Sequence, residues 1–209
     1  MWEWFHFILF SDLKKFFAVS DNNRINDYGD YVTLYKTLQS GDWKDANEFL
    51  RLHPDAISAK ITVMGKTALH VAVAAGHVHI VEELVKQMSE ENLEIQDAFG
   101  FTALHETTFG GNYRMAEFML RKNKNLISIE SDRKRIPVAM AITNGHVDLA
   151  RYLYSLTPLE DLMPEKGNNG ATLFTQAIYT RTLGKNSSSN YPLAIISEYS
   201  NLCHIIPFR

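Results

Sequence analysis

Residues 65–72 read Gly-Lys-Thr-Ala-Leu-His-Val-Ala, and the same pattern returns 35 positions later at residues 100–107 as Gly-Phe-Thr-Ala-Leu-His-Glu-Thr. The pattern returns once more at residues 136–141, which read Ile-Pro-Val-Ala-Met-Ala. Fainter copies lie upstream at residues 32–37 and downstream at residues 170–177. Five copies at a spacing of 34 to 36 residues indicate a chain built from repeated structural units.

Each copy is predicted to form two short helices joined by a turn. Thr67 and Thr102 lie where a hydroxyl caps the start of the first helix, and Pro137 occupies the first helical position of its copy. The glycines that follow, where a left-handed residue ends a helix, are Gly76, Gly111 and Gly145. Each second helix carries an apolar stripe that it can bury only against a neighbour: Ile80, Val81, Leu84 and Val85; Met115, Ala116, Met119 and Leu120; Leu149, Ala150, Leu153 and Tyr154. The sequence therefore predicts an all-α solenoid of about five helix–turn–helix repeats with irregular ends.

The histidines of the motif, and two departures from it, refine this prediction. His70 and His105 follow their threonines by three residues, so we expect them to bond the threonine hydroxyl and nearby backbone. The fourth copy has Ile136 and Ala139 at these two positions, which predicts a looser start to its first helix. In the fifth copy, residues 183–190 read as a loop where a second helix is due. Two interpretations of this end stay open: a displaced capping helix, or sequence from a truncated or misspliced product.

The chain divides into three parts on this pattern: residues 1–30, a repeat array at residues 31–180, and an irregular end at residues 181–209. Residues 2–17 are apolar and aromatic, and as a helix their large side chains would share one side. They are fewer than the roughly 20 residues that span a bilayer, and they lack the features of a secretion signal. Two roles stay open for them: packing against the first repeat, or lying in a membrane interface.

Composition and charge exclude several classes of protein. Hydrophobic residues make up 45% of the 209, which is enough to build a core. The net charge of −3 and the pI near 6.2 give no basic field for nucleic acid, so no nucleic-acid partner is expected. The single cysteine, Cys203, cannot form an internal disulfide, which favours a reducing, cytoplasmic location.

The motifs that would indicate an enzyme, a cofactor or a metal site are incomplete. Residues 65–67 end like a phosphate-binding loop, but Lys60 stands where that loop needs a glycine. Residues 105–106 begin like a zinc-protease motif, but Phe109 stands where the second histidine is required. We therefore expect no cofactor, no metal and no catalytic residues, and we do not expect an enzyme.

The motif at residues 67–72, with the Gly-His pair that follows it, resembles the signature of ankyrin repeats, and the likeness covers roughly residues 31–178. The opening of the array is similar, more narrowly, to plant ankyrin proteins that end in a PGG membrane domain. That likeness rests on three short stretches, Leu34-Tyr35-Lys36, Gly41-Asp42-Trp43 and His53-Pro54-Asp55-Ala56. In that family several transmembrane helices follow the cytosolic repeats, and this sequence has no such helices, so membrane attachment stays open.

The resemblance implies a non-catalytic module that binds a protein partner on the concave face of the solenoid. In the plant family the setting would be stress or defence signalling, in the cytoplasm or at the cytosolic face of a membrane, and we expect a monomer. Two alternatives stay open. One is a peripheral membrane component held by the aromatic helix at residues 2–17, and the other is a truncated product of a membrane-anchored ankyrin protein.

The family's variable positions, carried over to this sequence, predict where a partner would bind. Three phenylalanines in the third repeat fall at such positions, which is unusual for solvated surface. Aromatics together with arginine are the usual hot-spot residues of binding surfaces, so we expect the partner to bind here. The alternative that Phe99 or Phe101 packs between adjacent repeats stays open. The predicted binding residues are Met64, Lys66, Phe99, Phe101, Phe109, Arg133, Arg135, Asn144 and Asn169.

Overall fold

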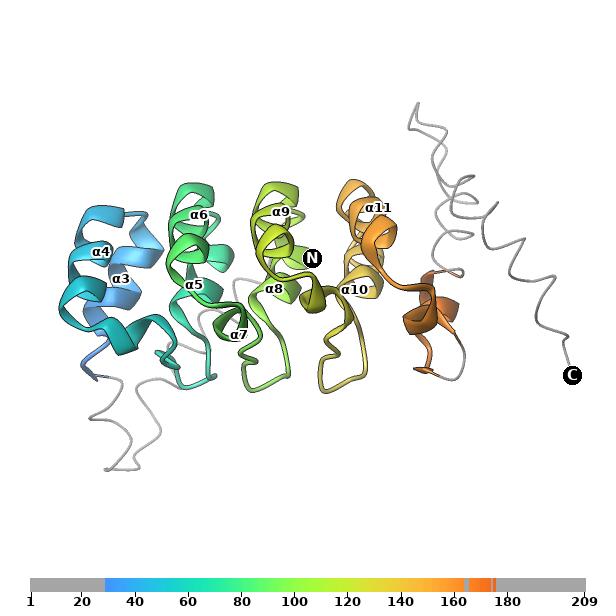
Figure 1. Cartoon of the computed structure of the whole chain (residues 1–209), viewed down its shortest axis with the longest axis horizontal. Helices are drawn as coiled ribbons and strands as arrows, with labels where there is room; N and C mark the ends of the chain where they lie inside the picture. Colours follow the sequence, from blue (N-terminus) through green and yellow to red (C-terminus); the bar gives the residue numbers. More distant parts are fainter. Residues whose placement is uncertain (1–28, 164–165, 174, 176–209) are drawn as a thin grey trace, which may run out of the picture.

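The computed structural model describes residues 29–163, 166–173 and 175, which form a row of helix pairs (Figure 1). In each pair the first helix lies in one layer and the second helix in another, and the loops between repeats project to the same side (Figure 1). First helices pack against first helices along the row, from α3 (Val32–Ser40) through α5 (Ala68–Ala75) and α8 (Ala103–Gly110) to α10 (Pro137–Thr143). The predicted all-α solenoid is confirmed.

The second layer consists of the longer second helices, each followed by a short helical segment. These second helices are α4 (Trp43–Leu52), α6 (Val78–Gln87), α9 (Tyr113–Lys122) and α11 (Val147–Leu156). The short segments that follow them are η1 (Pro54–Ile57), α7 (Glu90–Leu93), η2 (Lys124–Ser128) and η3 (Leu159–Leu162). Within this layer α6 packs against α9, and α9 against α11, so consecutive repeats bury each other's sides.

The helix ends are formed by the residues that the repeat pattern singles out. Thr67 and Thr102 each cap a first helix, and the histidine three residues later bonds back to the threonine in a reciprocal capping box. Gly76 and Gly111 close the same two helices in the left-handed conformation, with φ of 83° and 69°. The predicted starts and ends of α5 and α8 are therefore confirmed.

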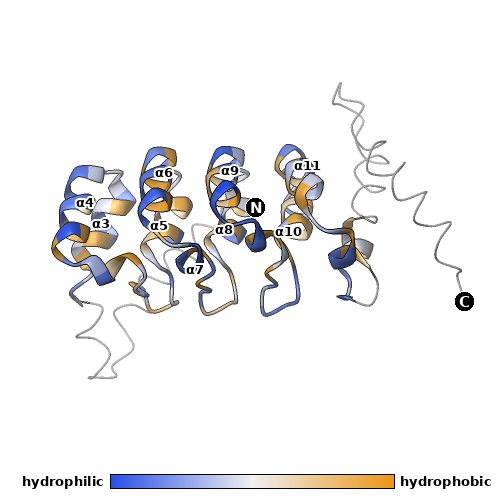
Figure 2. Cartoon of the chain, in the orientation of Figure 1, coloured by the Kyte–Doolittle hydropathy of each residue, from blue (hydrophilic) through white to orange (hydrophobic). Residues whose placement is uncertain are grey.

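The core runs without a break through the described repeats. Leu34, Leu69, Leu104 and Val138 occupy the same position in four successive first helices, and each is at most 1% exposed. The predicted apolar stripes of the second helices are buried against them, except that Tyr154 is only half-buried. The second helices carry hydrophobic and hydrophilic sides, as Figure 2 shows, and this pattern is what requires them to stack.

Backbone hydrogen bonds join the projecting turns of neighbouring repeats. The amide of Ala98 donates to the carbonyl of Met64 at 2.8 Å, and the amide of Asp132 donates to the carbonyl of Phe99 at 3.1 Å. The turns need a left-handed residue: Gly100 has φ of 73°, and a Cβ there would lie 2.5 Å from the backbone nitrogen of Asp132. Lys134 holds the equivalent position in the next turn with φ of 57°, the one positive φ among the described non-glycine residues.

Replacing Lys134 with glycine is expected to stabilise the protein by about 0.5–1 kcal/mol. A left-handed conformation costs an L-residue about 1–2 kcal/mol, and part of that gain is offset by the greater freedom of glycine in the unfolded chain. The surface ion pair of Lys134 with Glu130, at 3.4 Å, contributes little. Urea unfolding measures the change. Arg133→Gly is the matched control, because Arg133 has no positive φ, and it should not stabilise; equal midpoints for the two variants would contradict the strain argument.

The start of the fourth repeat is held by a residue that the repeat pattern does not supply. The amide of Ile136 donates to Oδ1 of Asn169 at 3.2 Å, and Nδ2 of Asn169 donates to the carbonyl of Lys134 at 3.1 Å. Asn169, in the following repeat, thus occupies the amide that a histidine occupies in the two preceding repeats. The predicted looseness of this helix start is therefore offset by a bond from the next unit.

The fifth copy differs in register from the expected one. Its alignment with Thr67 and Thr102 places a helix start just after Thr172, but the helix already begins at Asn169. Consistent with this earlier start, the amide of Thr172 donates to the carbonyl of Asn168 at 2.9 Å. This earlier start places Asn169 in the first turn of the helix, where its side chain bonds to the fourth repeat.

Several predictions concern residues outside the described ranges. These are the aromatic helix at residues 2–17 and the whole of the irregular end at residues 181–209, including the loop at residues 183–190. Among the described helices, none combines the length and the apolar character that crossing a membrane requires.

Candidate protein-binding surface

Three side chains of the third repeat line up along one side of α8. Phe101, His105 and Phe109 are spaced by four residues, which places them on one face of a helix and of the turn that leads into it. The ring of Phe101 stacks on His105, with centroids 5.6 Å apart and planes 23° apart. It also meets Phe109 edge-on at 5.8 Å. This side of the repeat is therefore an ordered aromatic column.

Phe99 extends the column outward from the tip of the turn. Its ring centroid lies 6.0 Å from that of Phe101, and its side chain is 48% exposed. Phe101 and Phe109 are half-buried. We call Phe99, Phe101 and Phe109 the aromatic patch. The structure brings these three predicted residues together, with Phe99 as the most exposed of them.

Asp97 holds the turn that carries the aromatic patch. Its carboxylate oxygen Oδ1 accepts from the amides of Phe99 and Phe101, at 2.8 and 3.0 Å. The side chain is 6% exposed, so these charge-assisted bonds lie away from water. The prediction from sequence did not include Asp97, although an aspartate three residues before a turn glycine is a recognisable signal.

Basic side chains of the neighbouring repeats flank the aromatic patch. Lys66, in the second repeat, makes an ion pair of 2.8 Å with Glu106, whose side chain is only 7% exposed. Arg135, in the fourth repeat, is exposed, and its carbonyl accepts from Nε2 of His105 at 3.3 Å. Arg133 is exposed as well, and among the described residues neither arginine side chain has an ion-pair partner. The patch thus has an occupied cation on one side and two unpaired cations on the other.

The remaining predicted residues have different surroundings. Met64 is half-buried, and its carbonyl takes part in the bond between turns. Asn144 is exposed at the end of α10 and donates to the carbonyl of Thr108 at 3.0 Å. Asn169 is 3% exposed and is used within the fold, so it lies apart from this surface. Glu106, which the prediction omitted, belongs to the surface through its pair with Lys66.

The two buried histidines are neutral structural residues. Nδ1 of His105 accepts from the amide of Thr102 at 3.1 Å, while Nε2 must be the protonated nitrogen, because the carbonyl of Arg135 can only accept. Burial lowers the pKa of His105 to about 4, whereas its bond to that carbonyl opposes the shift. Burial also lowers the pKa of His70, whose Nε2 donates to the carbonyl of Phe101 at 2.9 Å. Both nitrogens of each ring are occupied, and no cluster of three metal-ligating side chains occurs in the described part of the chain.

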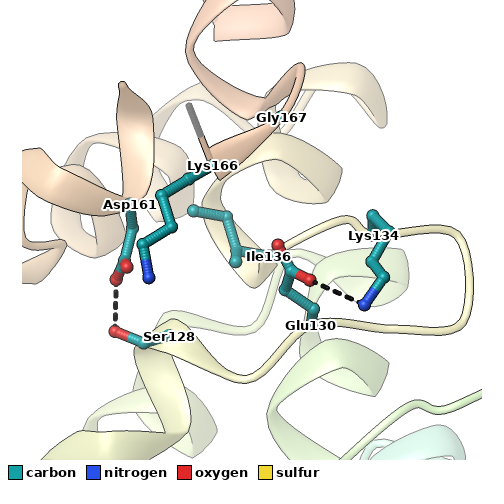
Figure 3. Close-up of a pocket in the computed structure, with 7 residues that line it drawn as sticks. All are labelled: Ser128, Glu130, Lys134, Ile136, Asp161, Lys166 and Gly167. Carbon is teal, nitrogen blue, oxygen red and sulfur yellow. Dashed lines mark hydrogen bonds and ion pairs between the residues drawn. The ribbon is translucent and has the colours of Figure 1, made fainter. Parts of the chain in front are cut away.

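A second feature is a pocket of about 630 Å³ at the far end of the array (Figure 3). It is lined by Ser128, Glu130, Lys134, Ile136, Asp161, Lys166 and Gly167. The hydroxyl of Ser128 donates to Asp161 at 2.5 Å, and Glu130 pairs with Lys134 at 3.4 Å, as the dashed lines in Figure 3 show. The two carboxylates and the two ammonium groups that line this pocket balance each other's charge. The pocket therefore indicates a particular ligand less clearly than the aromatic patch does.

Comparison with known proteins agrees with this geometry. Residues 39–130 match the family model described as ankyrin repeats, in three copies. The human calmodulin-binding transcription activator 2 is 29% identical over 113 residues, which are 49% of this chain and 9% of that protein. The ankyrin repeat-containing protein ITN1 of Arabidopsis thaliana is 30% identical over 71 residues, 34% of this chain and 12% of that protein.

A third relative is shorter. The probable 26S proteasome regulatory subunit p28 of Saccharomyces cerevisiae is 28% identical over 109 residues, which are 52% of this chain and 47% of that protein. The chain therefore spans less than half the length of each of these three relatives. The three-copy match assigns ankyrin repeats to residues 39–130, and the helix pairs and capping histidines give the described part of the chain the all-α solenoid fold that such repeats form.

Proposed function

We propose that this chain is a non-catalytic binding module that holds a protein partner on the concave face of the solenoid, formed by the turns and the first helices. Ankyrin repeats are protein–protein interaction modules, and this supports the general role. The aromatic patch supports the location, because exposed aromatics next to arginines are the usual centre of a binding surface. The chain acts as a monomer in this proposal, since the partner occupies a face that no second copy is needed to complete.

The setting that we propose is an adaptor in plant stress or defence signalling. The likeness to plant ankyrin proteins at the start of the array supports it, as does the similarity to ITN1 of Arabidopsis thaliana. In this setting the module works in the cytoplasm or at the cytosolic face of a membrane. Attachment through residues 2–17, the alternative to a freely diffusing adaptor, concerns residues outside the described ranges.

A paired capture experiment tests the binding face. The first bait is the unchanged chain, and the second carries Phe99→Ala and Phe101→Ala, after circular dichroism has shown equal helix content. Proteins that the first bait retains from a tissue extract should be lost by the second, because truncated hot-spot aromatics cost about 2 kcal/mol or more each.

The matched control is Tyr113→Ala, which removes an aromatic ring of similar exposure, 40%, from the second-helix layer. This bait should retain the same proteins as the unchanged chain. Identical lists from all three baits would show that the aromatic patch is internal packing, and loss in the Tyr113 variant alone would move the binding face to the second helices.

A further inference from the structure

We propose that the element recognised at the aromatic patch is an acidic peptide segment of the partner, with an apolar side chain between its carboxylates. The inference rests on the proposed function and adds the chemistry of the partner. An aromatic centre with cations beside it is complementary to an apolar anchor with anions beside it.

Hydrogen bonds connect the backbone near both arginines to the aromatic patch. His105 links Phe101 to Arg135, because its ring stacks on the one and its Nε2 donates to the carbonyl of the other. The amide of Asp132 donates to the carbonyl of Phe99, so Arg133 follows directly on a residue bonded to the patch. The backbones of both arginines therefore lie at the edge of the aromatic patch, on the side of the fourth repeat.

Most carboxylates near the two arginines are used within the fold. Oδ1 of Asp97 accepts from two backbone amides, while its buried Oδ2 has no partner among the described residues. Glu106 pairs with Lys66, and Glu130 with Lys134. Among the described residues of these turns, Asp132 is the exposed carboxylate without an ion-pair partner, and it has two exposed guanidinium groups to balance. The chain as a whole carries a net charge of −3, so this positive edge is local and not a reflection of the composition.

A carboxylate is the group that best matches two arginines beside an aromatic surface. A guanidinium offers a planar fork of donors that matches a carboxylate, and it is weakly hydrated enough to bind next to aromatic rings. Carboxylates in the partner would complete the donors of Arg133 and Arg135 while an apolar side chain contacts Phe99. A peptide fits better than a nucleic acid or an anionic membrane, because the aromatic patch beside the arginines offers an apolar contact for a side chain.

The test uses the full chain and three fluorescent synthetic peptides of equal length, each with a central phenylalanine. The flanking residues are glutamate in the first, glutamine in the second and lysine in the third. We expect the acidic peptide to bind about tenfold more tightly than the neutral one, with no measurable binding of the basic one. Added salt should weaken the binding of the acidic peptide and leave the binding of the neutral peptide unchanged.

The variant Arg133→Gln with Arg135→Gln should remove the preference for the acidic peptide, a loss of about tenfold in affinity. The matched control, Lys44→Gln with Arg114→Gln, makes the same change of charge at exposed positions of the second helices and should leave the affinity unchanged. Equal binding of the acidic and neutral peptides would overturn the inference, as would equal losses in the two double variants.

Phe99→Ala separates this inference from the proposed function. If it abolishes binding of both peptides while the acidic one has no advantage, the face is correct and the acidic partner is wrong. If Phe99→Ala has no effect on either peptide, the proposed binding face itself is wrong. Binding of the chain to anionic vesicles or single-stranded DNA through Arg133 and Arg135, without the acidic peptide, would also overturn the inference.

Discussion

Replacing Leu104 with alanine is expected to lower the free energy of unfolding by about 2–5 kcal/mol, the usual range for a buried leucine. Leu104 is completely buried in α8, in the interior of the core that joins the described repeats. Its removal takes apolar contacts from α8 and leaves a cavity, because packed helices relax only partly around a lost side chain. Because single repeats are not stable alone, the loss should lower the midpoint of the whole array.

Urea unfolding followed by circular dichroism measures this change. The matched control is Leu52→Ala, because Leu52 is 60% exposed at the end of α4 and its truncation should alter stability by less than about 0.5 kcal/mol. A loss below about 1 kcal/mol in Leu104→Ala, or equal losses in the two variants, would mean that the repeat is stabilised by something other than this core.

The sequence predicts the fold well because the features that define it are local and recur. A threonine cap, a histidine three residues later and a closing glycine all act within one helix, so Thr102, His105 and Gly111 can be interpreted without knowledge of the neighbouring repeat. The apolar stripe of α9 needs only the helical period. Such signals repeat with the unit, which is why the architecture could be predicted from them.

Features that depend on contacts between repeats were harder to predict. Asn169 was assigned to the surface from its position in the motif, but it donates and accepts within the turn of the fourth repeat. Its role depends on the earlier start of the last helix, and no local pattern indicates that shift. The burial of Asn169 therefore follows from where the last helix begins, and the residue type alone does not predict it.

The surface itself shows the same division. Phe101 and Phe109 lie four residues before and after His105, so their alignment could have been derived from helical spacing. The burial of Glu106 could not, because it depends on Lys66 of the preceding repeat, 40 positions earlier in the chain. Charged residues are seldom buried unless paired, so sequence alone favours a solvated Glu106.

Acid is expected to destabilise this fold through its buried histidines. The loss should begin near pH 6.5, where an ordinary histidine takes up a proton. In the unfolded chain His105 titrates near pH 6.5, whereas in the folded chain its pKa is about 4. Between these values the unfolded state binds the proton and the folded state does not. The stabilising contribution is complete above about pH 6.5 and is lost progressively as the pH falls toward 4.

The size of this effect follows from the shift. His105 alone should remove roughly 2–3 kcal/mol of stability between pH 7 and pH 4.5, since one unit of pKa corresponds to about 1.4 kcal/mol. The pKa of His70 is lowered in the same direction, chiefly by burial, so it adds to the slope. Urea unfolding at a series of pH values measures the total, which also contains the carboxylates that titrate in this range.

His105→Asn isolates the contribution of this one ring. The amide oxygen of asparagine can replace Nδ1 as acceptor for the amide of Thr102, while the bond to the carbonyl of Arg135 is lost. The variant should be less stable at pH 7 but should lose less stability on acidification, because it has one titrating group fewer. His79→Asn, at an exposed position of α6, should keep the slope of the unchanged protein. If His105→Asn also keeps that slope, the ring does not remain neutral in the fold, and the links that it makes between Phe101 and Arg135 would have to be reassigned.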